Sequence, residues 1–503
     1  MRHPVANPSS VAAAVAAGGA PDVAVPGYDR TRITAGIAHL GVGNFHRVHQ
    51  GVYLDDLMTM RDDHNEWGIV GIGLRDHALA KAKARSYAPD AQDGLYTVTL
   101  FTESGRRQSR IVGSMVEYLH GPDDPAAVVR RLADPAIRIV SLTITEGGYH
   151  LDEDTGEFRI DDSEVAADLA REHPETVFGV LTKALAKRRV DGTAPFTVMS
   201  CDNLRGNGDT ARTAVLGFAA AVDSVLAQWI ATNVTFPNSM VDRIAPTVSA
   251  SMRDDLNALT GLDDHVPALT EEYRQWVLQD HFPTGRPAFE DVGVQMRQDV
   301  EAFEAIKGRL LNASHMLLAY AGVLSGHRTV ADAASDPSIA NLLVCFMSTD
   351  AAPLLAPPPD VSLADYQSMV VGRFANANVP DTVLRVAHDG AAKLPVFHRA
   401  TATGLIAQGR DPRREALLLA AFRRYLGGID DHGDAFEVHE PHLSGADRSL
   451  LLSDDPLDAL RSSPFASWRL ADSADFVDRY TTVVAILDSH GIRAGIAYAL
   501  STD

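Results

Sequence analysis

The chain has 503 residues, of which 46% are hydrophobic and 22% are charged, and its formal net charge is −21 at pH 7. This length is sufficient for two or more domains with full-sized cores. The negative charge argues against non-specific binding to nucleic acid or to an anionic membrane, because a phosphate surface requires a basic face. Only two cysteines are present, Cys201 and Cys345, which argues against a disulfide framework and against a cysteine-based zinc site. We therefore expect a protein of a reducing, cytoplasmic compartment.

The N-terminal segment, residues 1–30, is expected to be a short arm. Its apolar stretch from Val11 to Pro21 consists of small residues and follows a single arginine, so it is a poor match to a secretory signal. Since the chain contains no run of 18 or more apolar residues, no membrane span is predicted.

Strand-like and helix-like segments alternate over the first 200 residues. Apolar, β-type runs occupy residues 36–40, 66–74, 95–101, 109–119, 136–149 and 195–203, and helical patterns occupy residues 46–60, 124–135 and 176–192. This alternation favours a parallel, doubly wound sheet of Rossmann type. After about Gln295 the pattern becomes helical, over residues 299–324, 339–355, 363–375, 414–426 and 473–491. The predicted fold class is α/β, with a Rossmann-type domain at residues 31–295 followed by a mostly α-helical domain at residues 296–503.

A glycine motif stands at the end of the first predicted strand. In "HLGVGNFHR", Gly41 and Gly43 follow the strand, and Asn44 and Phe45 open a helix. Two glycines serve a tight turn and the approach of a pyrophosphate to the helix N-terminus, but His46 stands where a third glycine is expected. These four residues, Gly41, Gly43, Asn44 and Phe45, are the predicted cofactor turn.

The second predicted strand ends in "GLRDHA", where Arg75 and Asp76 are further candidate cofactor residues. A carboxylate at this place accepts hydrogen bonds from the adenosine ribose of NAD, whereas an arginine accommodates the 2′-phosphate of NADP. We expect NAD as the cofactor, with NADP still possible.

Polar residues also follow later strands. Glu146 stands in "TITEGGY", Asn203 in "SCDNL" and Asp242 in "FPNSMVDRI". Ligands of open α/β sheets bind at the carboxyl ends of the strands, which makes these side chains candidates for substrate contact. A turn at Asn203 and a surface ion pair at Asp242 are the simpler interpretations.

The stretch "EAIKGRLLNASHML" places Glu304, Lys307, Asn312 and His315 within a short part of an otherwise apolar helix. At about 100° per residue, an α-helix would spread Lys307, Asn312 and His315 over one broad face. Taken alone, that face is more often solvated than catalytic.

Six motifs together resemble the polyol-specific long-chain dehydrogenases, and most of all their mannitol 2-dehydrogenase branch. They are "GIAHLGVGNFHRVHQ", "SLTITEGGY", "FTVMSCDNL", "FPNSMVDRI", "QWVLQDHF" and "KGRLLNASH", in that order. The resemblance runs from about Val25 to the last helices. It implies a Rossmann-type domain followed by a helical domain, use of NAD(P), no metal, a monomer, and a polyol or ketose as substrate.

The resemblance also implies roles for individual residues. Lys307 matches the catalytic base, Asn203 and Asn312 match the amides that hold the reacting oxygen, and His315 matches a substrate-positioning histidine. The substrate contacts are matched by Asp242, Arg385 and Lys393, and Glu304 and Glu146 are assigned to proton relay. The family has an acidic pair after its Leu-Arg, whereas this chain has Asp76 alone in shifted position, which leaves the choice between NAD and NADP open.

The implied reaction is the interconversion of D-mannitol and D-fructose by hydride transfer at C2. Other polyols, arabinitol or sorbitol, and a hexuronate of the fructuronate-reductase branch are alternatives. Gly147 stands where that branch has a lysine, which favours a neutral polyol, whereas Arg385 and Lys393 keep an acidic substrate open. A non-catalytic NAD-binding sensor would require a broken set of Lys307, Asn203, Asn312 and His315, and here the set is complete.

Overall fold

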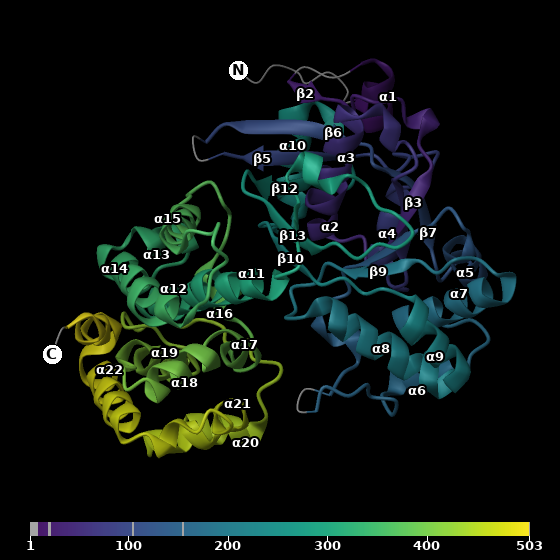
Figure 1. Cartoon of the computed structure of the whole chain (residues 1–503). Coiled ribbons are helices and arrows are strands. Elements are labelled where there is room, and N and C mark those ends of the chain that lie inside the picture. The colour runs from purple at the N-terminus through teal and green to yellow at the C-terminus, as the bar shows by residue number, and fades with distance from the viewer. Residues whose placement is uncertain (1–8, 19–21, 103–104, 153–154, 502–503) are drawn as a thin grey trace, which may run out of the picture. The chain divides into compact units, whose positions relative to one another are not determined.

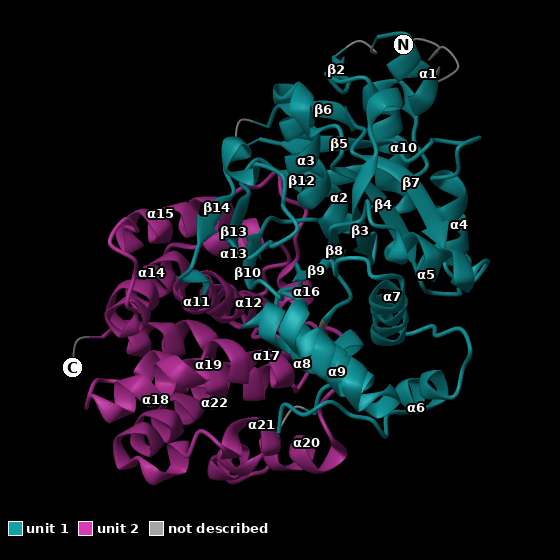
Figure 2. Cartoon of the chain, turned by 45° about the vertical axis from the view of Figure 1, so that its right-hand side comes forward, with its two compact units in different colours: residues 1–301 teal, residues 302–503 magenta. Residues whose placement is uncertain are grey.

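The computed structural model describes residues 9–18, 22–102, 105–152 and 155–501. The chain divides into two compact units, residues 1–301 (unit 1) and residues 302–503 (unit 2), shown in teal and magenta in Figure 2. Every strand of the described chain lies in unit 1, and the described part of unit 2 is helical (Figure 1). The prediction of a Rossmann-type unit followed by a mostly helical unit is confirmed. The predicted arm, residues 1–30, lies partly outside the described residues and stays a prediction.

A five-stranded parallel sheet forms the centre of unit 1, with the strand order β7-β4-β3-β8-β9. The strands are β3 (Ala35–Leu40), β4 (Gly68–Gly73), β7 (Met115–His120), β8 (Ile139–Leu142) and β9 (Thr197–Ser200). Numbered along the chain, these strands stand in the order 3-2-1-4-5 of a Rossmann-type sheet. The order reverses between β3 and β8, so the carboxyl ends of these two strands mark the place where such a sheet binds its ligand.

Both faces of this sheet are covered, which explains why its strands are continuous apolar runs. On β3, Ala38 and Leu40 belong to the core that contains α5 and α7, whereas Ile37 belongs to the core that contains α3. The helices of unit 1 are α1 (Val11–Ala16), α2 (Asn44–Val48), α3 (Gln50–Met60), α4 (Ala78–Ser86), α5 (Pro125–Ala133), α6 (Ser163–Leu169), α7 (Val177–Asp191), α8 (Asn207–Val222), α9 (Ser224–Asn233) and α10 (Ala250–Thr260).

Three smaller sheets complete unit 1. The first has the order β12-β5-β6-β2, with β2 (Val23–Ala24), β5 (Tyr96–Phe101), β6 (Arg107–Val112) and β12 (Ala268–Glu271). The second has the order β10-β13-β14, with β10 (Ser239–Asp242), β13 (Gln275–Gln279) and β14 (Gln295–Arg297). The third pairs β1 (Ser9–Ser10) with β11 (Leu262–Asp263).

Two segments differ from the sequence prediction. The single strand predicted at residues 109–119 is divided between β6 and β7, which belong to different sheets. The division falls at Gly113, whose amide donates to the buried Asp55 and whose Cα leaves no room for a side chain against Arg30 and Pro26. The helix predicted at residues 46–60 is broken at His49, where the backbone (φ −111°, ψ −91°) separates α2 from α3.

Unit 2 is built from helices around one apolar core. They are α11 (Val300–Ile306), which contains the boundary between the units, α12 (Ala313–Leu324), α13 (Val330–Ser335), α14 (Pro337–Cys345), α15 (Leu363–Phe374), α16 (Val383–Ala387), α17 (Gly390–Phe397), α18 (Arg399–Ala407), α19 (Arg413–Tyr425), α20 (Gly445–Leu451), α21 (Ser463–Ala466) and α22 (Ala474–Leu500). The helix α12, which is buried except at His315, and the inner faces of α19 and α22 supply much of this core.

The predicted α-helix at residues 299–324 contains a π-helix. Its segment η5, Lys307–Asn312, lies between α11 and α12, and the Ala313 amide donates to the Gly308 carbonyl five residues earlier. A second π-helix, η6 (Phe346–Ala351), continues α14. Since a π-helix has more residues per turn than an α-helix, the α-helical angles expected between Lys307, Asn312 and His315 do not apply. Single π turns inside α-helices are frequent at functional sites.

One described helix, α22, is long and apolar enough to pass a composition test for a membrane span. Its backbone leaves the helical region at Gly491 (φ 77°), where the Asp431 carboxylate accepts from the amide of Ile492. Its apolar face, including Phe476 and Leu487, packs in the core of unit 2. These features are those of a core helix interrupted by a turn.

Candidate active site

The glycine turn lies between β3 and α2, at the place where the strand order reverses. Gly41 has a φ of 95°, and a Cβ there would stand 2.1 Å from the carbonyl oxygen of Thr143. Gly41 is therefore required by the backbone and by its close approach to β8. At Gly43 the nearest atom to a Cβ is 3.6 Å away, so packing within the chain does not require glycine. The absence of a side chain at Gly43 fits a group that approaches the backbone closely at the amide end of α2.

His46 replaces the third glycine by stacking on a residue of the first strand. The rings of His39 and His46 lie 3.4 Å apart, centroid to centroid, at an angle of 13°. His39 is held by Ser141, 2.8 Å from Nδ1, and by Thr143, 3.0 Å from Nε2. Burial lowers the pKa of His39 to about 3 and that of His46 well below its usual value, so both rings are neutral at pH 7. The two imidazoles thus form the close contact between strand and helix that a third glycine usually allows.

Two cations hold the carbonyl groups of the glycine turn. The Lys83 ammonium on α4 donates to the Val42 carbonyl at 2.9 Å, and Arg47 Nε donates to the Gly43 carbonyl at 3.3 Å. Burial lowers the pKa of Lys83 to about 8. Arg47 also donates to Asn44 Oδ1 at 2.6 Å, and the ring of Phe45 stacks on His49 with the centroids 4.7 Å apart. These contacts fix the first turn of α2.

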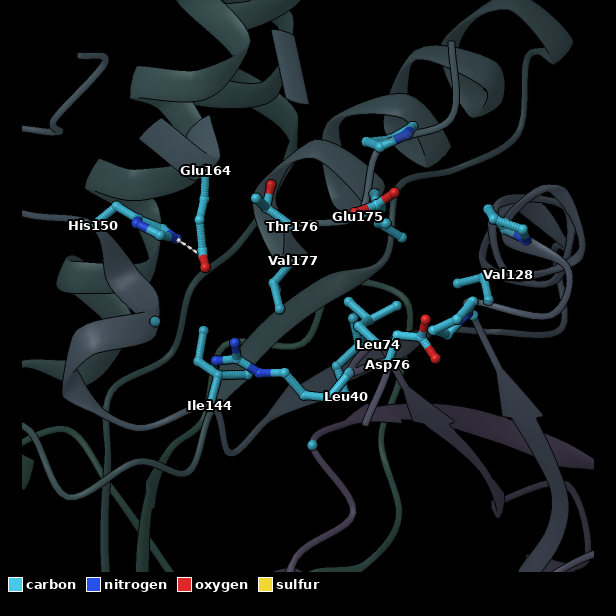
Figure 3. A pocket seen from close by; sticks show the side chains of 18 of the residues that line it. Leu40, Leu74, Asp76, Val128, Ile144, His150, Glu164, Glu175, Thr176 and Val177 are labelled. Atoms are coloured by element: carbon cyan, nitrogen blue, oxygen red, sulfur yellow. Dashed lines mark ion pairs between the residues drawn. The ribbon is translucent and has the colours of Figure 1, made fainter. Parts of the chain in front are cut away.

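A cavity of about 790 Å³ opens at the carboxyl edge of the parallel sheet (Figure 3). Apolar side chains line its floor, among them Leu40, Leu74, Val128, Ile144 and Val177. The polar side chains around them include Arg75, Asp76, Glu164, Glu175 and His150. Of the predicted cofactor residues, the lining includes Gly41, Arg75 and Asp76. A concave site lined by apolar side chains together with polar and charged groups is suited to a small-molecule ligand.

Asp76 forms an ion pair that sequence reasoning did not anticipate. Its Oδ1 lies 2.5 Å from the ammonium of Lys81, one turn into α4. The hydrogen bond from Lys81 lowers the pKa of Asp76 below its usual value. The carbonyl of Arg75 accepts from His120 Nε2 at 3.1 Å, which fixes the backbone just after β4.

The carboxylate of Asp202 organises the turn that follows β8. It accepts from the amides of Ile144 (3.1 Å) and Thr145 (2.8 Å) and from the hydroxyl of Tyr149 (2.7 Å). Thr145 has a φ of 65°, which is costly for a β-branched residue. Asp202 therefore stabilises a strained backbone that lines the cavity. Glu146 begins the 3₁₀ turn η3 (Glu146–Tyr149), and its side chain lies outside the described part of the chain.

Asn203 directly follows Asp202, and Asp242 ends β10. The side chain of Asn207 joins these two strand ends by donating to the carbonyl of Asp202 at 3.0 Å and to the carbonyl of Ser239 at 2.8 Å. Asn203 is exposed, whereas Asp242 is buried. Unit 1 thus brings the loops of two predicted substrate residues together through Asn207, a residue not singled out in the sequence.

In unit 2, the π-helix η5 begins at Lys307 and ends at Asn312. Lys307 is buried, with 8% of its surface exposed, and Glu304 and Asn312 are half-buried. Burial favours the neutral form of an amine, as a general base requires.

His315 lies next to a carboxylate that the sequence did not indicate. Its Nε2 is 4.0 Å from Asp381 Oδ2, and its ring stacks on Phe374 with the centroids 4.6 Å apart. That buried Nε2 has no hydrogen-bond partner among the described residues, which fits a role in binding a substrate hydroxyl. Burial lowers the pKa of His315 to about 4, although Asp381 opposes the shift, so the ring is neutral at pH 7.

The two predicted basic contacts of unit 2 have partners within that unit. Arg385 holds Asp381 through both guanidinium contacts, Nε–Oδ1 at 2.5 Å and Nη2–Oδ2 at 2.6 Å. The Lys393 ammonium donates to the His388 carbonyl at 2.6 Å. The bidentate pair with Arg385 fixes the Asp381 carboxylate beside His315, and the predicted contact of Arg385 with substrate stays a prediction. Among the described residues of both units, no group of three or more His, Cys, Asp or Glu side chains is placed to hold a metal ion.

A 3-2-1-4-5 sheet with a glycine turn and a cavity at its carboxyl edge defines the class of Rossmann-type nucleotide-binding proteins. Two family models match the chain, the mannitol dehydrogenase Rossmann domain at residues 35–291 and the mannitol dehydrogenase C-terminal domain at residues 299–487.

Similar proteins share most of the length of the chain. A polyol:NADP oxidoreductase of Gluconobacter oxydans is 43% identical, over 94% of this chain and 97% of that protein. A mannitol 2-dehydrogenase of Cereibacter sphaeroides is 42% identical, over 86% of this chain and 90% of that protein. Two solved structures each match with a TM-score of 0.87. They are a substrate-free D-sorbitol dehydrogenase (42% identity, 94% and 97% coverage) and the mannitol 2-dehydrogenase of Pseudomonas fluorescens in a ternary complex with NAD and D-mannitol (39% identity, 96% and 98% coverage).

The chain belongs to the mannitol dehydrogenase family, and it is an oxidoreductase.

Proposed function

We propose that the protein is an NAD-dependent polyol dehydrogenase that interconverts D-mannitol and D-fructose at C2 without a metal. The observation that carries this proposal is the complete set of Lys307, Asn203, Asn312 and His315, in a chain 39% identical to a mannitol 2-dehydrogenase whose structure holds NAD and D-mannitol. The predicted NAD(P) dependence is supported by both NAD- and NADP-named relatives.

The residues of unit 1 fit a dinucleotide. Gly41 allows the close turn after β3, Gly43 leaves the backbone at the start of α2 without a side chain, and the cavity beside Arg75 and Asp76 accommodates the adenosine end. A bound nicotinamide supplies the acceptor or donor of the C2 hydride. Asn44 and Phe45 shape the first turn of the helix beside the pyrophosphate position.

The proton and the oxygen of C2 are handled by side chains of the chain. Lys307, as the neutral amine, takes the proton of the C2 hydroxyl, and Glu304 passes it towards water. Asn203 and Asn312 donate amide hydrogens to the oxygen as negative charge develops, and one such donor contributes about 3 kcal/mol to lowering the barrier. His315 binds a neighbouring hydroxyl, Asp242 and Lys393 contact the polyol chain, and Glu146 belongs to the same proton path.

The first test is the oxidation of NADH in the presence of fructose, xylulose or fructuronate, with product analysis. We expect turnover with fructose and mannitol as the product. Sorbitol as the product would favour the second candidate, a sorbitol dehydrogenase, which is suggested by the D-sorbitol dehydrogenase structure that matches with the same TM-score. Turnover with fructuronate alone would indicate a hexuronate reductase. Binding of NADH without turnover of any of the three would indicate a sensor.

The second test is Lys307→Ala. Loss of a general base lowers kcat by about 10²–10⁴-fold, and small primary amines in the buffer restore part of it. The matched control is Lys187→Ala, which removes an exposed lysine paired with Asp191 on α7. Wild-type kcat in Lys307→Ala would show that another group is the base.

A further inference from the structure

A histidine–glutamate pair lies buried in unit 2, outside the residues already assigned. His398 stands between α17 and α18, and Glu415 lies in the first turn of α19. Neither side chain has any exposed surface. His398 Nδ1 is 3.1 Å and 3.2 Å from the two carboxyl oxygens of Glu415, and its Nε2 is 3.1 Å from the carbonyl oxygen of Ala313.

The geometry of the pair determines its protons. The Ala313 carbonyl accepts only, so His398 Nε2 must carry a hydrogen. A single proton then occupies the contact between Nδ1 and Glu415, either on the ring as an imidazolium or on the carboxyl group. In both forms the pair is neutral overall and Nε2–H donates to Ala313. Burial raises the pKa of Glu415, and His398 opposes that shift.

The carbonyl that His398 holds belongs to the active-site helix. Ala313 follows Asn312 directly, and its amide closes the last bond of the π-helix η5. The ring of His398 also lies 5.6 Å from that of Phe346, the first residue of the second π-helix, η6. On η6, Asp350 is paired with Arg414, the neighbour of Glu415, at 2.5 Å and 2.7 Å. The His398–Glu415 pair, called the dyad below, is thus placed where both π-helices meet α19.

We infer that His398 and Glu415 are positioning residues, which hold the junction of η5 and α12 and thereby the side chains of Lys307 and Asn312. The inference rests on the proposed function, because it takes these two side chains as the base and an oxygen ligand. Glu415 pairs with Nδ1 and thereby fixes the orientation of the ring, and His398 transmits that orientation to the backbone at Ala313. A π turn is less regular than an α-helix, and a fixed anchor at its end keeps it in one conformation.

The test compares three substitutions. Glu415→Leu removes the partner of Nδ1, His398→Phe removes both hydrogen bonds, and Glu415→Gln retains a donor to Nδ1 and so leaves Nε2–H on Ala313. We expect the first two to lower kcat about tenfold or more, as a displaced reacting group does, while the Kd of NADH stays within about twofold. Glu415→Gln should keep near wild-type kcat.

The second readout does not depend on activity. Amide hydrogen exchange in peptides covering residues 308–316 should become faster in Glu415→Leu and His398→Phe, and not in Glu415→Gln. The control is Asp430→Asn, which alters another buried carboxylate of unit 2, one that accepts from the amides of His432 and Asp434. It should leave both kcat and exchange at residues 308–316 unchanged. His398→Gln serves as a milder variant where the larger changes prevent folding.

The outcomes separate the two proposals. Folded Glu415→Leu, His398→Phe or His398→Gln proteins with wild-type kcat and wild-type exchange would overturn the positioning role. A Glu415→Gln protein as impaired as Glu415→Leu would overturn the idea that a hydrogen-bond partner at Nδ1 is sufficient to hold the ring. If Lys307→Ala keeps its activity, the proposed base is wrong, and the exchange data still decide whether the dyad anchors the helix.

Discussion

At the residue scale, we expect the cofactor preference to depend on how the charge of Asp76 is balanced. A free carboxylate after the second strand repels a 2′-phosphate, but Lys81 lies 2.5 Å from this one. Arg75 lines the same cavity. The local balance of charge at the ribose end is therefore less negative than the sequence "LRDH" suggests.

We predict that Lys81→Ala lowers the ratio of kcat/KM for NADPH over NADH by about two- to fivefold, because it leaves Asp76 unbalanced. Arg75→Ala should shift the ratio in the same direction, and Asp76→Asn should raise it. The ratio is measured with both cofactors at one ketose concentration, and Lys187→Ala is the exposed ion-pair control. A ratio equal to that of the wild type in all three variants would show that these residues do not determine cofactor preference.

At the element scale, the turn η3 and the helix η5 show what sequence patterns miss. "EGGY" indicated an unusual turn, but the strain resides at Thr145, and the carboxylate that stabilises it comes from Asp202, 57 residues later. Similarly, the residues of "KGRLLN" have the composition of an α-helix, but the structure has a π-helix there. The local sequence pattern indicates neither the contact with Asp202 nor the π-helix.

We predict that Asp202→Asn lowers the free energy of unfolding of unit 1 by about 1–3 kcal/mol. The substitution turns one of the two carboxylate oxygens, which accept from the backbone amides of Ile144 and Thr145, into an amide nitrogen that cannot accept. The Kd of NADH should rise with it, since the turn lines the cavity. Urea unfolding and NADH fluorescence titration measure the two effects. Tyr149→Phe, which removes one of the three bonds, should cost about 1 kcal/mol. Wild-type stability in Asp202→Asn would contradict the proposed support of the turn.

Part of the fold and of the candidate site could be predicted from the sequence, and part could not. Strand–helix alternation is sufficient for the parallel sheet, because its strands are buried on both faces. Gly41 was identified correctly as a turn residue, since its motif has a local geometric cause. Asp381, which lies beside His315 and pairs with Arg385, could not be predicted, because its position depends on the packing of α16 against α12.

At the scale of the whole molecule, buried neutral histidines link stability to pH. The pKa of His39 and of His49 is lowered to about 3 by burial, against about 6.5 in an unfolded chain. The unfolded state therefore binds more protons below pH 6.5, so these groups contribute stability that is complete above pH 6.5 and is lost as the pH falls towards 3.

We expect the free energy of unfolding to fall between pH 6.5 and 5 by about 1.4 kcal/mol per pH unit for each such histidine. Urea midpoints at pH 7.5, 6.5 and 5.5 measure the slope. His39→Gln should reduce it, whereas His265→Gln, at a side chain that is 56% exposed, should not. A stability independent of pH over this interval would show that the rings accept protons without unfolding.

The two cysteines have a practical consequence. Cys201 follows β9 in unit 1 and is buried among apolar side chains, and Cys345 ends α14 in unit 2 and is partly exposed. Burial and the neighbouring Asp202 raise the pKa of the Cys201 thiol far above its usual value, so little reactive thiolate forms in the folded state. The natural chain thus carries one internal reporter in each half. A thiol reagent labels Cys345 at once. It labels Cys201 only when the nucleotide-binding half opens, so the rate of the second, slow labelling phase measures that opening.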